Sequence, residues 1–175
     1  SSNTESLMSN QVEVKPNTPP YAPDSLFLEK GPRTIEVKWP KSTSNSVTKY
    51  ALYRKTLGHS ILLSDTFHHR SFLDTGLVVG QNYEYSVYSI DSVGVFSLSS
   101  ISKSAYASKV WYVSLTGSNS NLGTRSKPLL NIDYTMNRAV KGDTIVLLDG
   151  TYKERINFTN RIFHLASEYV IDKDE

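Results

Sequence analysis

Between residues 21 and 108, apolar side chains recur at every second position in short segments that turn residues separate. Residues 34–39 show the pattern most clearly, because Ile35, Val37 and Trp39 fall on one face of an extended chain. A period of two buries one face of a β-strand and does not match the 3.6-residue period of a helix. This alternation therefore predicts an antiparallel sheet protein with one buried face per sheet.

Six further segments complete the pattern. They are the segment that begins at residue 23 and residues 49–55, 61–63, 72–77, 83–90 and 97–106. In 49–55 one face holds Tyr50, Leu52 and Arg54, and in 83–90 one face holds Tyr83, Tyr85 and Val87. Gly80 and Gly94 mark turns between them, and the eleven tyrosines suit β-structure. The segments together predict a seven-stranded antiparallel sandwich.

Several landmarks make this stretch resemble a fibronectin type III domain. They are Pro23-Asp24-Ser25-Leu26, Trp39, Tyr50-Ala51-Leu52-Tyr53-Arg54, Phe72 to Leu77, Tyr83 to Val87, and Asp91 to Ser97. The resemblance implies that Trp39 is the tryptophan of the second strand. It also implies that Leu77 and Tyr83 belong to a corner in which the Tyr83 hydroxyl bonds back to the backbone.

The pattern changes near Lys109. Residues 110–113 read as a strand and residues 116–126 as a glycine-, serine- and asparagine-rich loop. Pro128 begins a helical period, with Leu129, Ile132, Met136 and Ala139 on one stripe, and Asn131 or Asp133 suits the start of the helix dipole. Lys141-Gly142-Asp143 ends that helix.

Residues 144–148 form a nearly continuous apolar run, as expected for a strand buried on both faces. A turn follows at Asp149-Gly150-Thr151-Tyr152, then an alternation at 155–158 and a strand at 162–167. This order resembles the amino-terminal cap and first coil of a pectin-lyase-like right-handed parallel β-helix. Its landmarks here are Trp111, Gly123, Ile132, Gly142, Asp143, Gly150 and Tyr152. The resemblance implies that the helix covers the bare end of the first coil.

Three regions follow from these patterns. Residues 1–20 are predicted to be a disordered or extended leader, 21–108 a fibronectin type III-like domain, and 109–175 the start of a β-helix. Because the chain begins at Ser1 and stops at Glu175 without a turn or cap, we expect a piece of a longer protein. At least about three repeats normally stabilise a solenoid, so residues beyond about 143 should be less stable here than in the parent.

We predict no catalytic, cofactor-binding or metal-binding residue in this chain. His59, His68, His69 and His164 are interpreted as structural or loop residues. Asp143 could serve as a general acid or metal ligand, but beside a glycine at a corner it more often caps backbone N–H groups. Asp149, Glu154 and Arg155 are weak catalytic candidates, because the resemblance places catalytic carboxylates and bases on later coils. Asn157-Phe158-Thr159 is a glycosylation sequon.

Charge and composition exclude some classes of partner. The net charge is +2, from 19 basic and 17 acidic residues, which is too balanced to attract nucleic acid or an anionic membrane. The absence of cysteine excludes disulfides and thiolate metal sites. No apolar run is long enough for a membrane span. Tyr53, Tyr88 and Tyr106 could stack on sugars or simply cover an outer sheet face.

We therefore expect a non-catalytic, monomeric amino-terminal region of a larger extracellular or cell-surface protein, of bacterial origin. Its sandwich would act as a spacer or scaffold, and the parent would contact a polysaccharide or cell-surface glycan, as a polysaccharide lyase or glycoside hydrolase does. One alternative is an adhesion protein whose β-helix has no chemistry. Another is a sandwich that itself binds a glycan or a protein.

Overall fold

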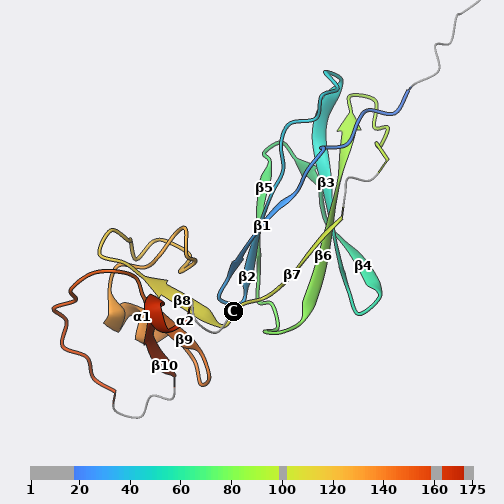
Figure 1. Cartoon of the computed structure of the whole chain (residues 1–175). Coiled ribbons are helices and arrows are strands. Elements are labelled where there is room, and N and C mark those ends of the chain that lie inside the picture. The colour runs from blue at the N-terminus through green and yellow to red at the C-terminus, as the bar shows by residue number, and fades with distance from the viewer. Residues whose placement is uncertain (1–17, 99–101, 159–162, 172–175) are drawn as a thin grey trace, which may run out of the picture.

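The computed structural model describes residues 18–98, 102–158 and 163–171. Most of the predicted leader lies outside these residues. The described chain is mainly β, and it contains two hydrophobic cores, one in an antiparallel sandwich and one in a small parallel sheet (Figure 1).

Within the described residues the sandwich has seven antiparallel strands, the number that the alternation predicts. They are β1 Phe27–Gly31, β2 Thr34–Lys38, β3 Val47–Thr56, β4 His59–Phe67, β5 Ser71–Thr75, β6 Asn82–Asp91 and β7 Lys103–Tyr106. One sheet has the order β1-β2-β5 and the other the order β4-β3-β6-β7. Each neighbouring pair is antiparallel, so the predicted antiparallel sandwich is confirmed.

The inward faces of these strands are the ones that the period of two selects. Ile35, Val37, Leu52 and Val87 are fully buried, and Trp39 packs edge-on against neighbouring rings. Burial of such side chains contributes roughly 1.5–3 kcal/mol each relative to an exposed position. The sandwich core therefore follows directly from the sequence pattern.

Two strand lengths differ from the prediction. β4 runs over nine residues instead of three, because it pairs with β3 across a tight hairpin at Leu57 and Gly58, both with positive φ. β7 begins at Lys103 instead of Ser97. The Ser97 hydroxyl accepts a hydrogen bond from the Ser89 N–H, and the Ser97 N–H donates to the Ser89 carbonyl, so Ser97 ends the β6 ladder locally.

The second core lies between a parallel sheet and a short helix. The sheet has the order β10-β9-β8, from β8 Val110–Val113, β9 Thr144–Leu147 and β10 His164–Ser167. The helices are α1 Ile132–Arg138 and α2 Glu168–Ile171. The three strands pair in register, so that Trp111, Ile145 and Leu165 form one row across the sheet. Three parallel strands are fewer than a β-helix needs, so that architecture is not shown.

The first helix begins later than predicted. Leu129 is not helical: its N–H donates to the Tyr112 carbonyl and its carbonyl accepts from the Ser114 N–H, both at 2.9 Å. Those bonds tie residue 129 to the outer edge of β8, so α1 starts only at Ile132. Leu129, Ile132 and Met136 are nevertheless buried in the second core, as the stripe predicts. The alternation at 155–158 forms no strand.

Candidate functional site at the joint between the two cores

Asp143 joins the sandwich to the parallel sheet. Its carboxylate accepts two hydrogen bonds from the Arg33 guanidinium, at 2.7 and 3.0 Å. It also accepts the Trp111 indole N–H at 2.9 Å and the Val140 backbone N–H at 3.0 Å. Its side chain is 1% exposed, whereas that of Arg33 is 34% exposed. A buried carboxylate with four donors from three segments holds those segments at fixed positions.

This geometry shifts the acidity of both partners. Burial by itself would raise the pKa of Asp143, but the hydrogen bonds from Arg33, Trp111 and Val140 outweigh it and lower the pKa below its ordinary value of 3.8. The Arg33 guanidinium donates to Asp143, and this hydrogen bond raises the pKa of Arg33. The pair is therefore charged over the neutral range, and Asp143 has no free oxygen with which to act as an acid.

Arg33 reaches Asp143 from the tight turn between β1 and β2. Its φ is +53°, a left-handed conformation that is uncommon for residues other than glycine. The turn is fixed on both sides, since the Arg33 N–H donates to the Ser108 carbonyl and its carbonyl accepts from the Leu77 N–H, both at 3.0 Å. The strained residue is thus the one whose side chain crosses the joint.

A second group of contacts crosses the joint on the β1–β2 face of the sandwich. The Glu29 carboxylate accepts hydrogen bonds from the hydroxyls of Thr124, at 2.6 Å, and Ser126. Lys127 donates to both oxygens of Glu36, at 2.8 and 3.0 Å. Burial opposes ionisation of Glu36, yet the bonds from Lys127 and Lys38 lower its pKa. Two separate contact groups restrain rotation at the joint better than one does.

Glu154, a weak catalytic candidate, caps helix α1. Its carboxylate accepts the backbone N–H groups of Ile132, at 3.0 and 3.1 Å, and Asp133, at 3.2 Å. Asp133 lies in the first turn of α1, where the sequence analysis expects an acidic side chain to suit the dipole, while Asn131 makes no side-chain cap. The capping carboxylate also lies at the helix N-terminus, where the dipole favours it, and it comes from a later segment of the chain.

Two sandwich landmarks bond to the backbone through their hydroxyls, and Trp39 comes one residue after the end of β2. The Tyr83 hydroxyl accepts the Val78 N–H at 2.9 Å, five residues back along the chain. The Tyr50 hydroxyl accepts the Ser42 N–H at 3.1 Å. Leu77 is buried. These residues hold the sandwich together and do not contact the joint, except through the Leu77 backbone.

The landmarks of the second core are backbone and packing positions. Gly123 has a φ of +75°, and a Cβ there would lie 2.8 Å from the Trp111 ring. Gly142 has a φ of +85° with open space around it, and Gly150 has a φ of +152°. The Tyr152 hydroxyl lies 3.0 Å from the Val113 carbonyl oxygen and 2.8 Å from that of Leu148, and burial raises its pKa.

A charged cluster inside the sandwich was not predicted. Arg54 shares the inward face with Leu52, as the alternation indicates, and donates to both oxygens of Asp74, at 2.8 and 2.9 Å. The Tyr85 hydroxyl donates to Asp74 at 2.7 Å, and burial together with that bond raises the pKa of Tyr85. The cluster links the two sheets and compensates the burial of Asp74.

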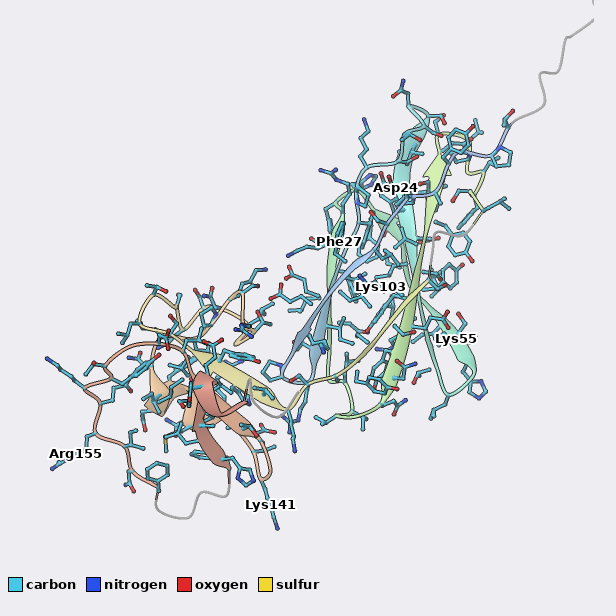
Figure 2. The ribbon with its side chains drawn as sticks, in the orientation of Figure 1. Asp24, Phe27, Lys55, Lys103, Lys141 and Arg155 are labelled. Carbon is cyan, nitrogen blue, oxygen red and sulfur yellow. The ribbon has the colours of Figure 1, made fainter. Side chains whose placement is uncertain are left out.

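The other candidates do not converge on one place. All four histidines are exposed, as are Asp149 and Arg155. Figure 2 shows Arg155 on the side of the second core that faces away from the sandwich. Within the described residues no cluster of His, Asp or Glu could hold a metal ion. Of the sequence candidates, Asp143 lies in the joint and Glu154 caps α1.

The outer tyrosines cover one another. Tyr53 and Tyr88 lie edge to face with ring centroids 5.3 Å apart, and Tyr88 meets Phe96 at 6.4 Å. Tyr106 stands apart from that group and is 59% exposed. In an edge-to-face pair the edge of one ring covers a face of the other, which favours a covering role for these tyrosines.

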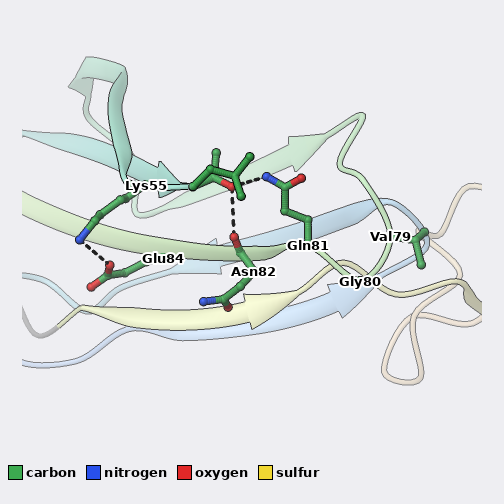
Figure 3. Close-up of a pocket in the computed structure, with 9 residues that line it drawn as sticks. Lys55, Val79, Gly80, Gln81, Asn82 and Glu84 are labelled. Atoms are coloured by element: carbon green, nitrogen blue, oxygen red, sulfur yellow. Dashed lines mark hydrogen bonds and ion pairs between the residues drawn. The ribbon is translucent and has the colours of Figure 1, made fainter.

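A groove of about 500 Å³ lies between the β3–β4 turn and the loop before β6. Figure 3 shows the residues that line it. Several of its polar groups pair with one another. Lys55 pairs with Glu84 at 3.5 Å, and the Thr56 hydroxyl bonds to the Asn82 carbonyl at 3.2 Å and to the Gln81 amide. A ligand there would have to displace these bonds.

The sequence predicts backbone capping for Asp143, and Asp143 performs it towards Val140. It does not predict the roles of Arg33, Glu29, Glu36 and Lys127, because each contact joins residues about 90 or more positions apart. Arg33 follows Pro32 in a turn, and no local pattern there indicates a partner 110 positions away.

No protein-family description matches this chain, and no curated protein matches it. Among solved structures it is similar to a Fn3-like protein from Clostridium thermocellum, at 22% identity and a TM-score of 0.44, over 50% of this chain and 92% of that one. The fn3 domain of the human collagen alpha-1(XX) chain has 19% identity and a TM-score of 0.45, over 54% of this chain and 90% of that one. The chicken CNTN1 FN1–FN3 domains have 16% identity and a TM-score of 0.44, over 50% of this chain and 32% of that one.

These structural neighbours are fibronectin type III domains, and each covers about half of this chain. The fold of the sandwich itself rests on its strand order and pairing. In the described ranges, none of the helices has the length and apolar character that crossing a bilayer requires.

Proposed function

We propose that this chain is a non-catalytic scaffold in which the sandwich holds the first turn of a right-handed parallel β-helix. The boundary between the two parts lies near residue 108. The observation that supports this best is Asp143, which follows α1, precedes β9 and is bound to the sandwich through Arg33. The sandwich thereby fixes the start of the strand on which later coils would stack.

Among the described residues, the parallel sheet has one covered edge and one edge without a paired strand. The outer edge of β8 is hydrogen-bonded to the loop before α1. The Tyr112 N–H donates to the Gly123 carbonyl, the Leu129 N–H donates to the Tyr112 carbonyl, and the Leu129 carbonyl accepts from the Ser114 N–H. β10, at the other edge, pairs only with β9 among the described strands. From Thr144 to His164 the chain advances 20 residues between stacked strands, a length that suits one coil of a solenoid. An open edge in register is a template for the next coil.

The structure of the longer gene product tests this proposal. We expect a further strand to pair in parallel with β10, roughly 20–30 residues after it. An antiparallel partner, or a β10 left unpaired, would contradict the β-helix.

We also propose that the parent is extracellular and associated with carbohydrate, as an enzyme or an adhesion protein. Cleavage of a polyuronate by this chain alone would contradict its non-catalytic role.

A further inference from the structure

A cleft opens between the two cores beside the joint. Strand β1 supplies Glu29 and Lys30, strand β8 supplies Tyr112, and the loop before α1 supplies Arg125 and Ser126. Its volume is about 520 Å³, within the range of small-molecule sites, which often lie between domains. The cleft exists only because the two cores dock.

The two walls of the cleft are fixed to one another. Ser126 and Thr124 donate to Glu29, and the neighbouring Lys127 binds Glu36 of β2. On the far side the Arg33–Asp143 pair completes the joint. A site whose walls are already held in place loses little conformational entropy on binding.

The lining offers both kinds of hydrogen-bonding group. Both bonds to Glu29 reach its Oε1 atom, so in the described chain Oε2 is left to accept from a ligand. Arg125 supplies a planar cation that already holds the Glu168 carboxylate, and Tyr112 supplies an aromatic ring. Vicinal hydroxyls of a sugar donate to a carboxylate and accept from a cation, while the sugar's apolar face packs on a ring.

The charges in and around the cleft cancel. Lys30 and Arg125 are positive, and Glu29 and Glu168 are negative. A negatively charged ligand would meet one carboxylate for each cation, so an acidic sugar gains no net attraction here. A neutral polyhydroxylated ligand is not penalised in this way.

We propose that this cleft binds one or two units of a neutral saccharide. The proposal gives a place and a ligand class to the carbohydrate association proposed above, and it rests on that association. It places the sugar contact at the joint and leaves the outer tyrosines of the sandwich as a cover for the sheet face.

Titration of the whole chain, followed by amide NMR shifts, tests the proposal. The probes are cellotetraose and xylotetraose, which are neutral, and tetragalacturonate, which is acidic. We expect at least one neutral probe to shift amides of β1, β8 and residues 123–127, with a dissociation constant of about 1 mM. Tetragalacturonate should bind at least about tenfold more weakly.

Tyr112→Ala should weaken saccharide binding about tenfold. Tyr112→Phe keeps the ring and should bind as the unmodified chain does. Normal binding by Tyr112→Phe would show that the loss in Tyr112→Ala comes from the missing ring. Tyr106→Ala, which changes an exposed tyrosine outside the lining, should leave binding unchanged. The proposal is overturned by any of three results: no shift at about 10 mM of either neutral probe, shifts centred on Tyr53 and Tyr88, or tighter binding of tetragalacturonate. None of these results bears on the pairing of β10, which tests the β-helix separately.

Discussion

Arg33 and Asp143 form the contact on which the joint depends most. Arg33→Ala leaves the Asp143 carboxylate buried without its charged partner. Because Arg33 is one-third exposed, we expect a loss of about 2–3 kcal/mol from the second core, less than for a fully buried pair. Urea unfolding monitored through β9 amides measures it. Lys55→Ala, which removes an exposed pair with Glu84, should cost under about 0.5 kcal/mol. Equal effects of the two variants would contradict the role given to Arg33.

The lowered pKa of Asp143 makes the second core sensitive to acid. A carboxyl group whose pKa is lower in the folded state contributes stability above its unfolded pKa and loses it as pH falls through the folded one. The stability of β8–β10 should therefore be level at neutral pH and fall below about pH 4. Asp143→Asn should show a shallower fall over the same range, and parallel curves would count against this assignment.

Gly123 faces the Trp111 ring, and its substitution separates crowding from backbone strain. Gly123→Ala should cost more than about 2 kcal/mol, because the new Cβ would overlap the ring. Gly142→Ala has a similar φ but open space, so it should cost only about 1 kcal/mol. Thermal unfolding of both variants gives the difference, and equal losses would show that the ring moves freely.

At the scale of elements, helix α1 depends on a distant carboxylate. Glu154→Gln keeps a hydrogen-bond acceptor but removes the charge at the helix N-terminus, so we expect a loss of about 0.5–1 kcal/mol. The neighbouring exposed Lys153→Gln serves as the control. Hydrogen exchange at Thr135 and Met136 is the measurement, and unchanged protection in Glu154→Gln would argue against the cap.

The open edge of β10 leads to a second prediction for the elements. Amides after about residue 143 should exchange faster in this chain than in the longer protein, because β10 pairs only with β9 among the described strands. Hydrogen exchange compares the two. Protection in β9 and β10 as high as in β3 and β6 would refute the need for further coils.

The sequence predicts elements well where one local period decides them. The alternation around Val37 and Val87 selects the inward faces, and the stripe through Ile132 and Met136 selects the buried face of α1. It fails where a distant partner decides. Leu129 leaves the helix because β8 takes its backbone groups, and the helix cap comes from Glu154. The joint is invisible to local patterns for the same reason.

At the scale of the whole molecule, two cores are held together by contacts on the β1–β2 side of the sandwich. Figure 1 shows the parallel sheet beyond the turn between β1 and β2, with the other end of the sandwich far from it. The sandwich therefore sets the direction in which β8, β9 and β10 stack. We infer that this fixed direction makes the sandwich a scaffold rather than a flexible neighbour.

Backbone ¹⁵N relaxation of the whole chain measures this fixed direction most directly. If the joint holds, amides of β1–β7 and of β8–β10 report one common overall tumbling, and Arg33→Ala separates them into two faster motions. A clearly shorter correlation time for β8–β10 than for the sandwich in the unmodified chain would contradict the central claim.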